Sequence, residues 1–124
     1  MYFTQVTIPQ EVLKRFTLPE GATLSLRIAP EEESPEGSFA SGDDAQDAAH
    51  VASINADREW NEWAWCFVTV CVTDGDASGS DSLGCCNYSS GEDFMEPGDY
   101  FDDMVGIATA EYATERQRLV EKYS

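Results

Sequence analysis

The chain has 124 residues, a formal net charge of −17 and 42% hydrophobic residues, including three Trp, five Tyr and six Phe. This length supports one hydrophobic core, so we expect a single domain over residues 1–124, and the aromatic content argues against disorder. The negative charge argues against direct binding of nucleic acid or of an anionic membrane. The sequence has no apolar run of membrane-spanning length and no signal-peptide pattern at its start, so we expect a cytoplasmic protein with reduced thiols.

The first third of the chain predicts two short strands and a short helix. Residues 3–8 form a β-prone run, and Pro9 suits the first position of a helix that ends near Phe16. In residues 22–29, three aliphatic residues alternate with polar ones. That alternation is typical of a half-buried strand.

Two segments before the middle of the chain are less regular. Residues 30–44 are rich in Pro, Gly, Ser and acids, which predicts a mobile acidic loop. Ser41 and Asp44 resemble a capping box that opens an Ala-rich helix. Residues 50–55 fit a strand equally well, so the sequence leaves helix and strand open at 45–55.

The central hairpin is the expected core of the fold. Residues 63–73 are almost all aromatic, β-branched or small, which predicts a strand. Both of its alternating faces are mostly apolar, as in a central strand covered on two sides. Residues 74–81 are a Gly/Ser/Asp turn, and residues 82–88 return as the antiparallel partner.

The last quarter of the chain predicts one long helix. After an acidic loop at residues 89–98, apolar residues recur at helical spacing from Asp99 to about Lys122. Acids occupy its first turn and bases its end, the signs that the helix dipole favours. With this helix on one face of a small antiparallel sheet, the predicted fold is a two-layer α+β structure.

The acidity is regional. Between Glu31 and Asp103 the chain has 19 acids and one base, Arg58, whereas the remainder has five acids and six bases. Carboxylates held on a rigid fold can imitate the phosphate charge of a duplex. We therefore expect the partner to be a basic nucleic-acid-binding protein or complex whose cationic site this chain occludes. No cofactor is expected, and the oligomeric state is not predicted.

The expected partner-binding residues are carboxylates held by the hairpin, by the loop after it and by the start of the long helix, with one tryptophan as an aromatic anchor. They are Asp74, Asp76, Asp81, Glu92, Asp93, Asp99, Asp102, Asp103 and Trp60. The other two tryptophans, Trp63 and Trp65, are expected in the core.

One segment resembles the start of a calcium-binding loop. Asp74, Asp76 and Ser78 occupy the first, third and fifth positions, and Gly79 the sixth. The twelfth position, where such a loop has Glu, is Cys85. Because a hairpin turn also favours Asp and Gly, we expect no metal here.

Thiol and histidine positions do not predict catalysis. An eight-residue turn would bring Cys71 near Cys86 on one face and Cys66 near Cys85 on the other. Thiols spread in this way do not converge on zinc, so buried small hydrophobes are the expected role. His50 is the sole histidine and no nucleophile motif is present, so we expect no enzyme.

In size, charge and lack of a catalytic motif, the chain resembles the small acidic inhibitors that phages and plasmids make against host defences, the anti-restriction and anti-CRISPR proteins. The runs W-N-E-W-A-W, L-G-C-C-N-Y-S and Y-F-D-D-M-V also resemble segments of uncharacterised mobile-element proteins. The resemblance implies a DNA-mimic inhibitor that acts in a host cytoplasm. The alternatives are a halophilic or calcium-binding globular protein, or an acidic adaptor that binds a basic protein without mimicry.

Overall fold

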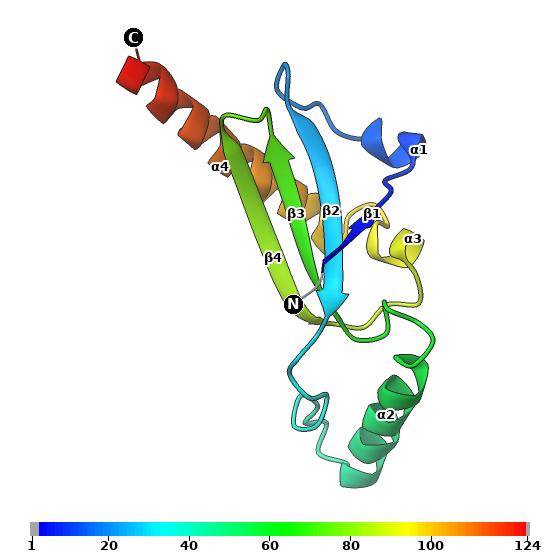
Figure 1. The fold of residues 1–124 in the computed structure, drawn as a ribbon. Coiled ribbons are helices and arrows are strands. Elements are labelled where there is room, and N and C mark those ends of the chain that lie inside the picture. Colours follow the sequence, from blue (N-terminus) through cyan, green and yellow to red (C-terminus); the bar gives the residue numbers. More distant parts are fainter. Residues whose placement is uncertain (1–2, 124) are drawn as a thin grey trace.

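A computed structural model describes residues 3–123 and contains a four-stranded antiparallel sheet in the order β1-β2-β3-β4 (Figure 1). Each strand pairs with the next one in the sequence, so the sheet is a simple meander. The predicted α+β fold is confirmed. In chain order the elements are β1 (Thr4–Val6), α1 (Gln10–Leu13), β2 (Thr23–Pro30), α2 (Asp44–Asp57), β3 (Cys66–Thr73), β4 (Ser78–Cys86), α3 (Gly91–Phe94) and α4 (Tyr100–Tyr123).

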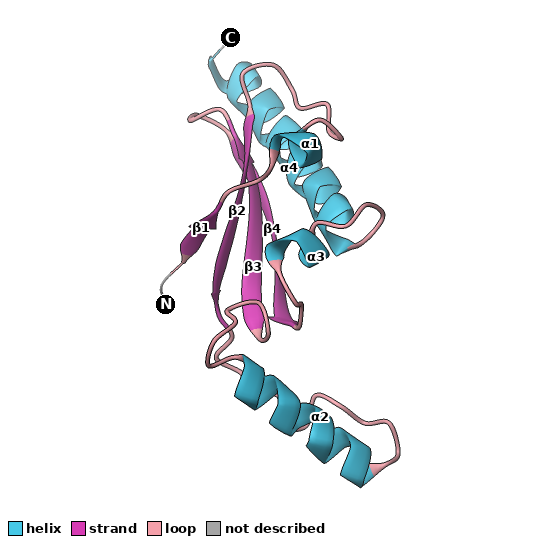
Figure 2. Ribbon diagram, turned by 90° about the vertical axis from the view of Figure 1, so that its right-hand side faces the viewer, coloured by secondary structure: helices cyan, strands magenta, loops and turns pink. Residues whose placement is uncertain are grey.

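Helices cover one face of the sheet. Figure 2 shows α1, α3 and α4 on the same side, and no helix of the described residues lies against the opposite face. The inward side chains of β3, Val68, Val70 and Val72, are fully buried. On the other face Thr69 is buried, whereas Phe67, Cys71 and Thr73 are half-buried. The prediction that β3 is covered on both sides was therefore wrong. Its thiol and hydroxyl side chains suit a face that reaches water.

The long helix α4 packs where its apolar spacing predicted. Its buried residues recur on one face, and they are Phe101, Met104, Val105, Ala108 and Tyr112. The helix approaches the backbone of β4 closely at Gly79. A Cβ built there would lie 2.1 Å from the Ala108 carbonyl oxygen and 2.3 Å from the Tyr112 nitrogen. Only glycine fits this crossing.

An aromatic cluster closes the core beside α3. The Phe94 ring lies 5.6 Å from Trp63, 5.1 Å from Tyr88 and 5.6 Å from Phe101, measured between ring centroids. The helix α3 lies within a segment that the sequence predicted as loop. It begins because the Ser90 side chain caps it by accepting the Asp93 N–H. Four residues are too few for helical periodicity to appear in the sequence.

The hairpin turn is shorter than predicted, because Asp74 closes it early. The Asp74 N–H donates to the Ala77 carbonyl (3.2 Å), and the Asp74 carboxylate accepts the N–H groups of Asp76 (2.9 Å) and Ala77 (2.8 Å). These bonds satisfy a four-residue turn, so β4 begins at Ser78 and not at residue 82.

The shorter turn changes which cysteines are neighbours. Cys66 pairs with Cys86, and Cys71 pairs with Ser80, so both predicted cysteine neighbours were wrong. Between the Val68–Leu83 pair and the Cys66–Cys86 pair, β4 holds one more residue than β3, which makes a β-bulge. Cys85 lies in this bulge with φ of +55°.

The strand β3 begins three residues later than predicted, because Asn61 folds the preceding segment into a turn. Its side-chain oxygen accepts the Trp63 N–H (3.0 Å), and its carbonyl accepts the Ala64 N–H (3.1 Å). Trp63 lies in the core, as expected. Trp65 is also buried, and it lies beside Phe39, with 6.4 Å between the ring centroids.

The segment that the sequence left open forms the helix α2. Its N-cap is Asp43, whose side chain accepts the Gln46 N–H, so the predicted pair of Ser41 and Asp44 is not the cap. Figure 1 shows α2 below the sheet and away from α4, and Ile54 is its one buried residue. In α1, likewise, Pro9 is the N-cap and not the first helical residue, and the helix is a single turn.

Candidate acidic interface

The predicted interface residues do not gather into one patch. Asp74 and Asp76 lie at the β3–β4 turn, whereas five others lie in or just before α3 and the first turn of α4. Asp74 contacts Arg116 of α4, which is 14 residues beyond Asp102, or about 21 Å along the helix. Asp81 lies on β4, at the edge of the sheet. Trp60 follows α2 and is 76% exposed.

Asp74 is held inside the fold. Besides the two turn N–H groups, its carboxylate accepts the Tyr112 hydroxyl (2.8 Å) and lies 3.4 Å from the Arg116 guanidinium. The N–H of Ala77, the Tyr112 hydroxyl and the N–H of Asp76 lower the pKa of Asp74 to about 2. These contacts engage both carboxylate oxygens, so Asp74 has a structural role in this turn.

Asp74 gives the protein a specific acid sensitivity. Its folded pKa of about 2 lies below the usual 3.8, so its stabilising effect is complete above pH 4 and is lost as the pH falls toward 2. We expect Asp74→Asn to lower the free energy of unfolding at pH 7, and the difference from the wild type to shrink steadily below pH 4. Urea unfolding of both proteins across this range measures it.

Asp76→Asn is the matched control, because the neighbouring Asp76 side chain has no bond to the rest of residues 3–123. This control is expected to leave the free energy of unfolding nearly unchanged at pH 7. If the difference in unfolding free energy between wild type and Asp74→Asn stayed constant from pH 7 to pH 2, Asp74 would not have a lowered pKa in the folded protein.

Three more predicted interface acids also stabilise the fold. Asp102 forms an ion pair with Arg15 and accepts the Gly98 N–H. Asp99 accepts the Tyr100 N–H at the start of α4, and Asp93 accepts the N–H and hydroxyl of Ser89. Neutralising these residues would therefore weaken the fold as well as any binding surface.

The remaining predicted acids are open. Asp76, Glu92 and Asp103 are exposed and Asp81 is half-buried, and within residues 3–123 no hydrogen bond or ion pair engages their carboxylates. An exposed carboxylate without an internal cation keeps its charge available to a partner. We name Asp76, Asp81, Glu92 and Asp103 the open acids.

The structure adds a second acidic region, which we name the limb and define as residues 31–62. It contains ten carboxylates and one base, Arg58, and it ends beside the exposed Trp60. Figure 1 shows that its helix α2 stands apart from the sheet. A tilted contact between the Phe39 and His50 rings, with 4.2 Å between their centroids, joins the limb loop to α2. The sequence shows the charge of this segment, but it does not show that the segment projects away from the sheet.

One group of side chains in the described residues has the composition of a cation site. Donor atoms of Glu31, Glu33 and Cys85 lie within 4.8 Å of one another. Glu31 accepts the Cys85 N–H (2.7 Å), which fixes the bulge. Desolvation by the surrounding atoms, followed by the charges of the two carboxylates, raises the pKa of the Cys85 thiol. Its contacts hold the bulge together.

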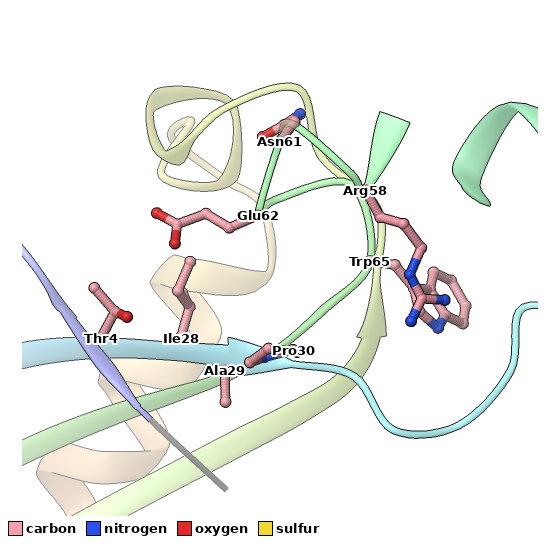
Figure 3. Close-up of a pocket in the computed structure, with 8 residues that line it drawn as sticks. All are labelled: Thr4, Ile28, Ala29, Pro30, Arg58, Asn61, Glu62 and Trp65. Carbon is pink, nitrogen blue, oxygen red and sulfur yellow. The ribbon is translucent and has the colours of Figure 1, made fainter. Parts of the chain in front are cut away.

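A small cavity of about 250 Å³ lies between the sheet and the base of the limb (Figure 3). Its lining residues are Thr4, Ile28, Ala29, Pro30, Arg58, Asn61, Glu62 and Trp65. Asn61 already donates to the carbonyls of Tyr88 and Ser89, so it is part of the framework. The lining has no His or Cys, and it does not assemble a nucleophile and base. That the protein is not an enzyme stays a prediction.

Searches against protein-family models, curated proteins and solved structures gave no match. None of the described helices combines the length and the apolar character that crossing a membrane requires.

Proposed function

We propose that this protein is a non-enzymatic acidic inhibitor that binds a basic nucleic-acid-handling protein and occludes its nucleic-acid site. The partner would be a host defence complex or another enzyme that acts on nucleic acid. The protein would work in the cytoplasm, and its carboxylates would take the place of backbone phosphates.

The observation that carries this proposal is the surplus of carboxylates over cations on a packed scaffold. Residues 3–123 contain three ion pairs, Arg15–Asp102, Arg116–Asp74 and Arg118–Glu115, although the chain has 24 acids. Repulsion among the other carboxylates weakens folding unless something offsets it. Binding to a cationic surface would offset this repulsion and would give the negative charge a role in recognition.

The spacing of the open acids suits a long cationic groove. Asp103 lies in the first turn of α4 and Asp76 lies beside Arg116, about 20 Å further along the helix, a length that corresponds to roughly twelve phosphate charges of a duplex. The limb extends the acidic surface beyond the sheet, and Trp60 offers an aromatic side chain that a partner can bury. A nucleic-acid enzyme presents Lys and Arg over such a length.

Two variants with equal net charge test where binding occurs. The scaffold variant carries Asp76→Asn, Glu92→Gln and Asp103→Asn, and the limb variant carries Glu32→Gln, Glu36→Gln and Glu59→Gln. All six residues are exposed, and within residues 3–123 none of their carboxylates has a hydrogen bond or ion pair. Tagged wild type is used to capture partners from a nuclease-treated bacterial lysate, with washes at low and high salt.

We expect the wild type to enrich one nucleic-acid-handling complex, which high salt or added duplex DNA releases. The scaffold variant should retain about a tenth as much of it or less, because each lost charge pair costs on the order of 1 kcal/mol. The limb variant should retain more. Equal losses in both variants would mean that net charge alone drives binding. Capture of many basic proteins that leave together would contradict the proposal.

A further inference from the structure

Two buried thiols meet at the open end of the central hairpin. Cys66 is the first residue of β3 and Cys86 the last of β4, and the two are direct partners in the sheet. They are 0% and 3% exposed, and each thiol donates to a nearby backbone carbonyl, Cys66 to Trp63 (3.8 Å) and Cys86 to Leu83 (3.4 Å). Paired Cα atoms of antiparallel strands are roughly 4.5–5.5 Å apart, a distance that a disulfide can bridge.

We propose that Cys66 and Cys86 form an oxidation site for hydrogen peroxide, at which the two thiols close to an intramolecular disulfide between β3 and β4. This site is independent of the acidic surface. It would make the base of the hairpin responsive to peroxide in a compartment that otherwise keeps thiols reduced.

The reaction begins at Cys86. The neighbouring Cys66 thiol lowers the pKa of Cys86, so Cys86 supplies the thiolate. Its sulfur attacks one peroxide oxygen, an S–O bond forms, the O–O bond breaks, and the departing hydroxide takes a proton to become water. The Cys66 sulfur then attacks the sulfenic sulfur, the S–S bond forms, and a second water leaves. Two thiols and one peroxide give one disulfide and two waters.

The position of the pair gives peroxide a route to it. Both residues are strand ends, and strand ends open locally far more often than the whole protein unfolds. The bulge at Cys85 interrupts the ladder directly beside them. Cys85 itself is exposed, but its raised pKa leaves less of it in the reactive thiolate form. Cys71 is opposite Ser80, so it has no thiol partner across the strands.

The disulfide would fasten the point where the limb and α3 join the sheet. Cys66 follows the turn that buries Trp63, and Cys86 precedes Tyr88, whose N–H donates to the Trp63 carbonyl (2.8 Å). A covalent link there closes the segment 66–86 in the unfolded chain as well, which disfavours unfolding. The oxidised protein should therefore melt at a higher temperature than the reduced protein.

The test uses the double variant Cys71→Ala/Cys85→Ala, which keeps both thiols of the pair, beside the wild type. Each protein is fully reduced, treated with hydrogen peroxide and alkylated in denaturant, and its disulfides are then located by non-reducing peptide mapping. We expect the double variant to become a monomer that lacks two hydrogens, takes up no alkylating agent and links Cys66 to Cys86. Dithiothreitol should restore both thiols and the lower melting temperature.

Two results would overturn the proposal. One is a double variant in which Cys66 and Cys86 remain fully alkylated after peroxide treatment. The other is a wild type in which the oxidation products are confined to Cys85 or Cys71, as oxyacids or as disulfides between molecules. The wild type settles the question if the double variant does not fold, because peptide mapping distinguishes all four cysteines.

Discussion

Replacing Gly79 with alanine is expected to lower the free energy of unfolding by about 3 kcal/mol or more, at the upper end of what overpacking costs. The added Cβ would lie 2.1 Å from the Ala108 carbonyl oxygen and 2.3 Å from the Tyr112 nitrogen, and both atoms belong to the backbone of α4. A backbone cannot rotate away as a side chain does. The whole helix must move off β4, which opens the core along their contact.

Gly106→Ala is the matched control, because this glycine lies in α4 and a Cβ added to it would meet no other part of the fold within 4 Å. Alanine favours a helix interior, so this variant should gain roughly 0.5–1 kcal/mol. Urea unfolding measures both variants. Equal free energies of unfolding for Gly79→Ala and the wild type would mean that α4 does not cross β4 at this distance.

Truncating Phe94 to alanine is expected to cost about 4 kcal/mol of unfolding free energy, a large part of the stability of a domain of this size. Phe94 is fully buried, and its ring contacts those of Trp63, Tyr88 and Phe101. Its removal leaves a cavity where α3, α4 and the turn before β3 meet. Thermal unfolding followed by circular dichroism should show a drop in melting temperature of well over 10 °C, at about 3–5 °C for each kcal/mol.

Two controls make the Phe94 result specific. Phe94→Leu retains most of the buried volume and should cost much less than the alanine variant. Phe3→Ala removes an aromatic ring that is 40% exposed, so its effect should also be smaller. If Phe3→Ala and Phe94→Ala proved equally destabilising, the aromatic cluster around α3 would not be the centre of the core.

The sequence predicted the fold well where the signal was local. Alternation marked β2, and helical spacing marked α4 almost to its ends. The predicted bounds of a strand or turn were wrong where the hydrogen bonds of a single side chain fix that bound. Asp74 shortened the hairpin turn, and Asn61 delayed the start of β3. Neither effect changes composition or periodicity, so neither is visible in a pattern.

For the candidate site, the sequence predicted where the acids lie along the chain. It did not predict which carboxylates form contacts within the fold and which stay open. Within residues 3–123, the carboxylates of Asp74 and Asp102 form hydrogen bonds and ion pairs, whereas those of Asp76 and Asp103, residues of the same type, do not. Tyr112 reaches Asp74 across 38 residues of sequence, and Arg15 reaches Asp102 across 87. Contacts between residues so far apart depend on how the elements pack. Which carboxylates stay open to a partner therefore had to come from the structure.

The sequence by itself determined the regional acidity, the two-layer α+β class and the core-facing side of α4, because these depend on composition and on short repeating spacings. Only the tertiary structure decided the pairing of Cys66 with Cys86, the open helix-free face of the sheet and the projection of the limb. Strand register depends on the length of the turn, and a shift in register changes every residue that faces a partner across the strands.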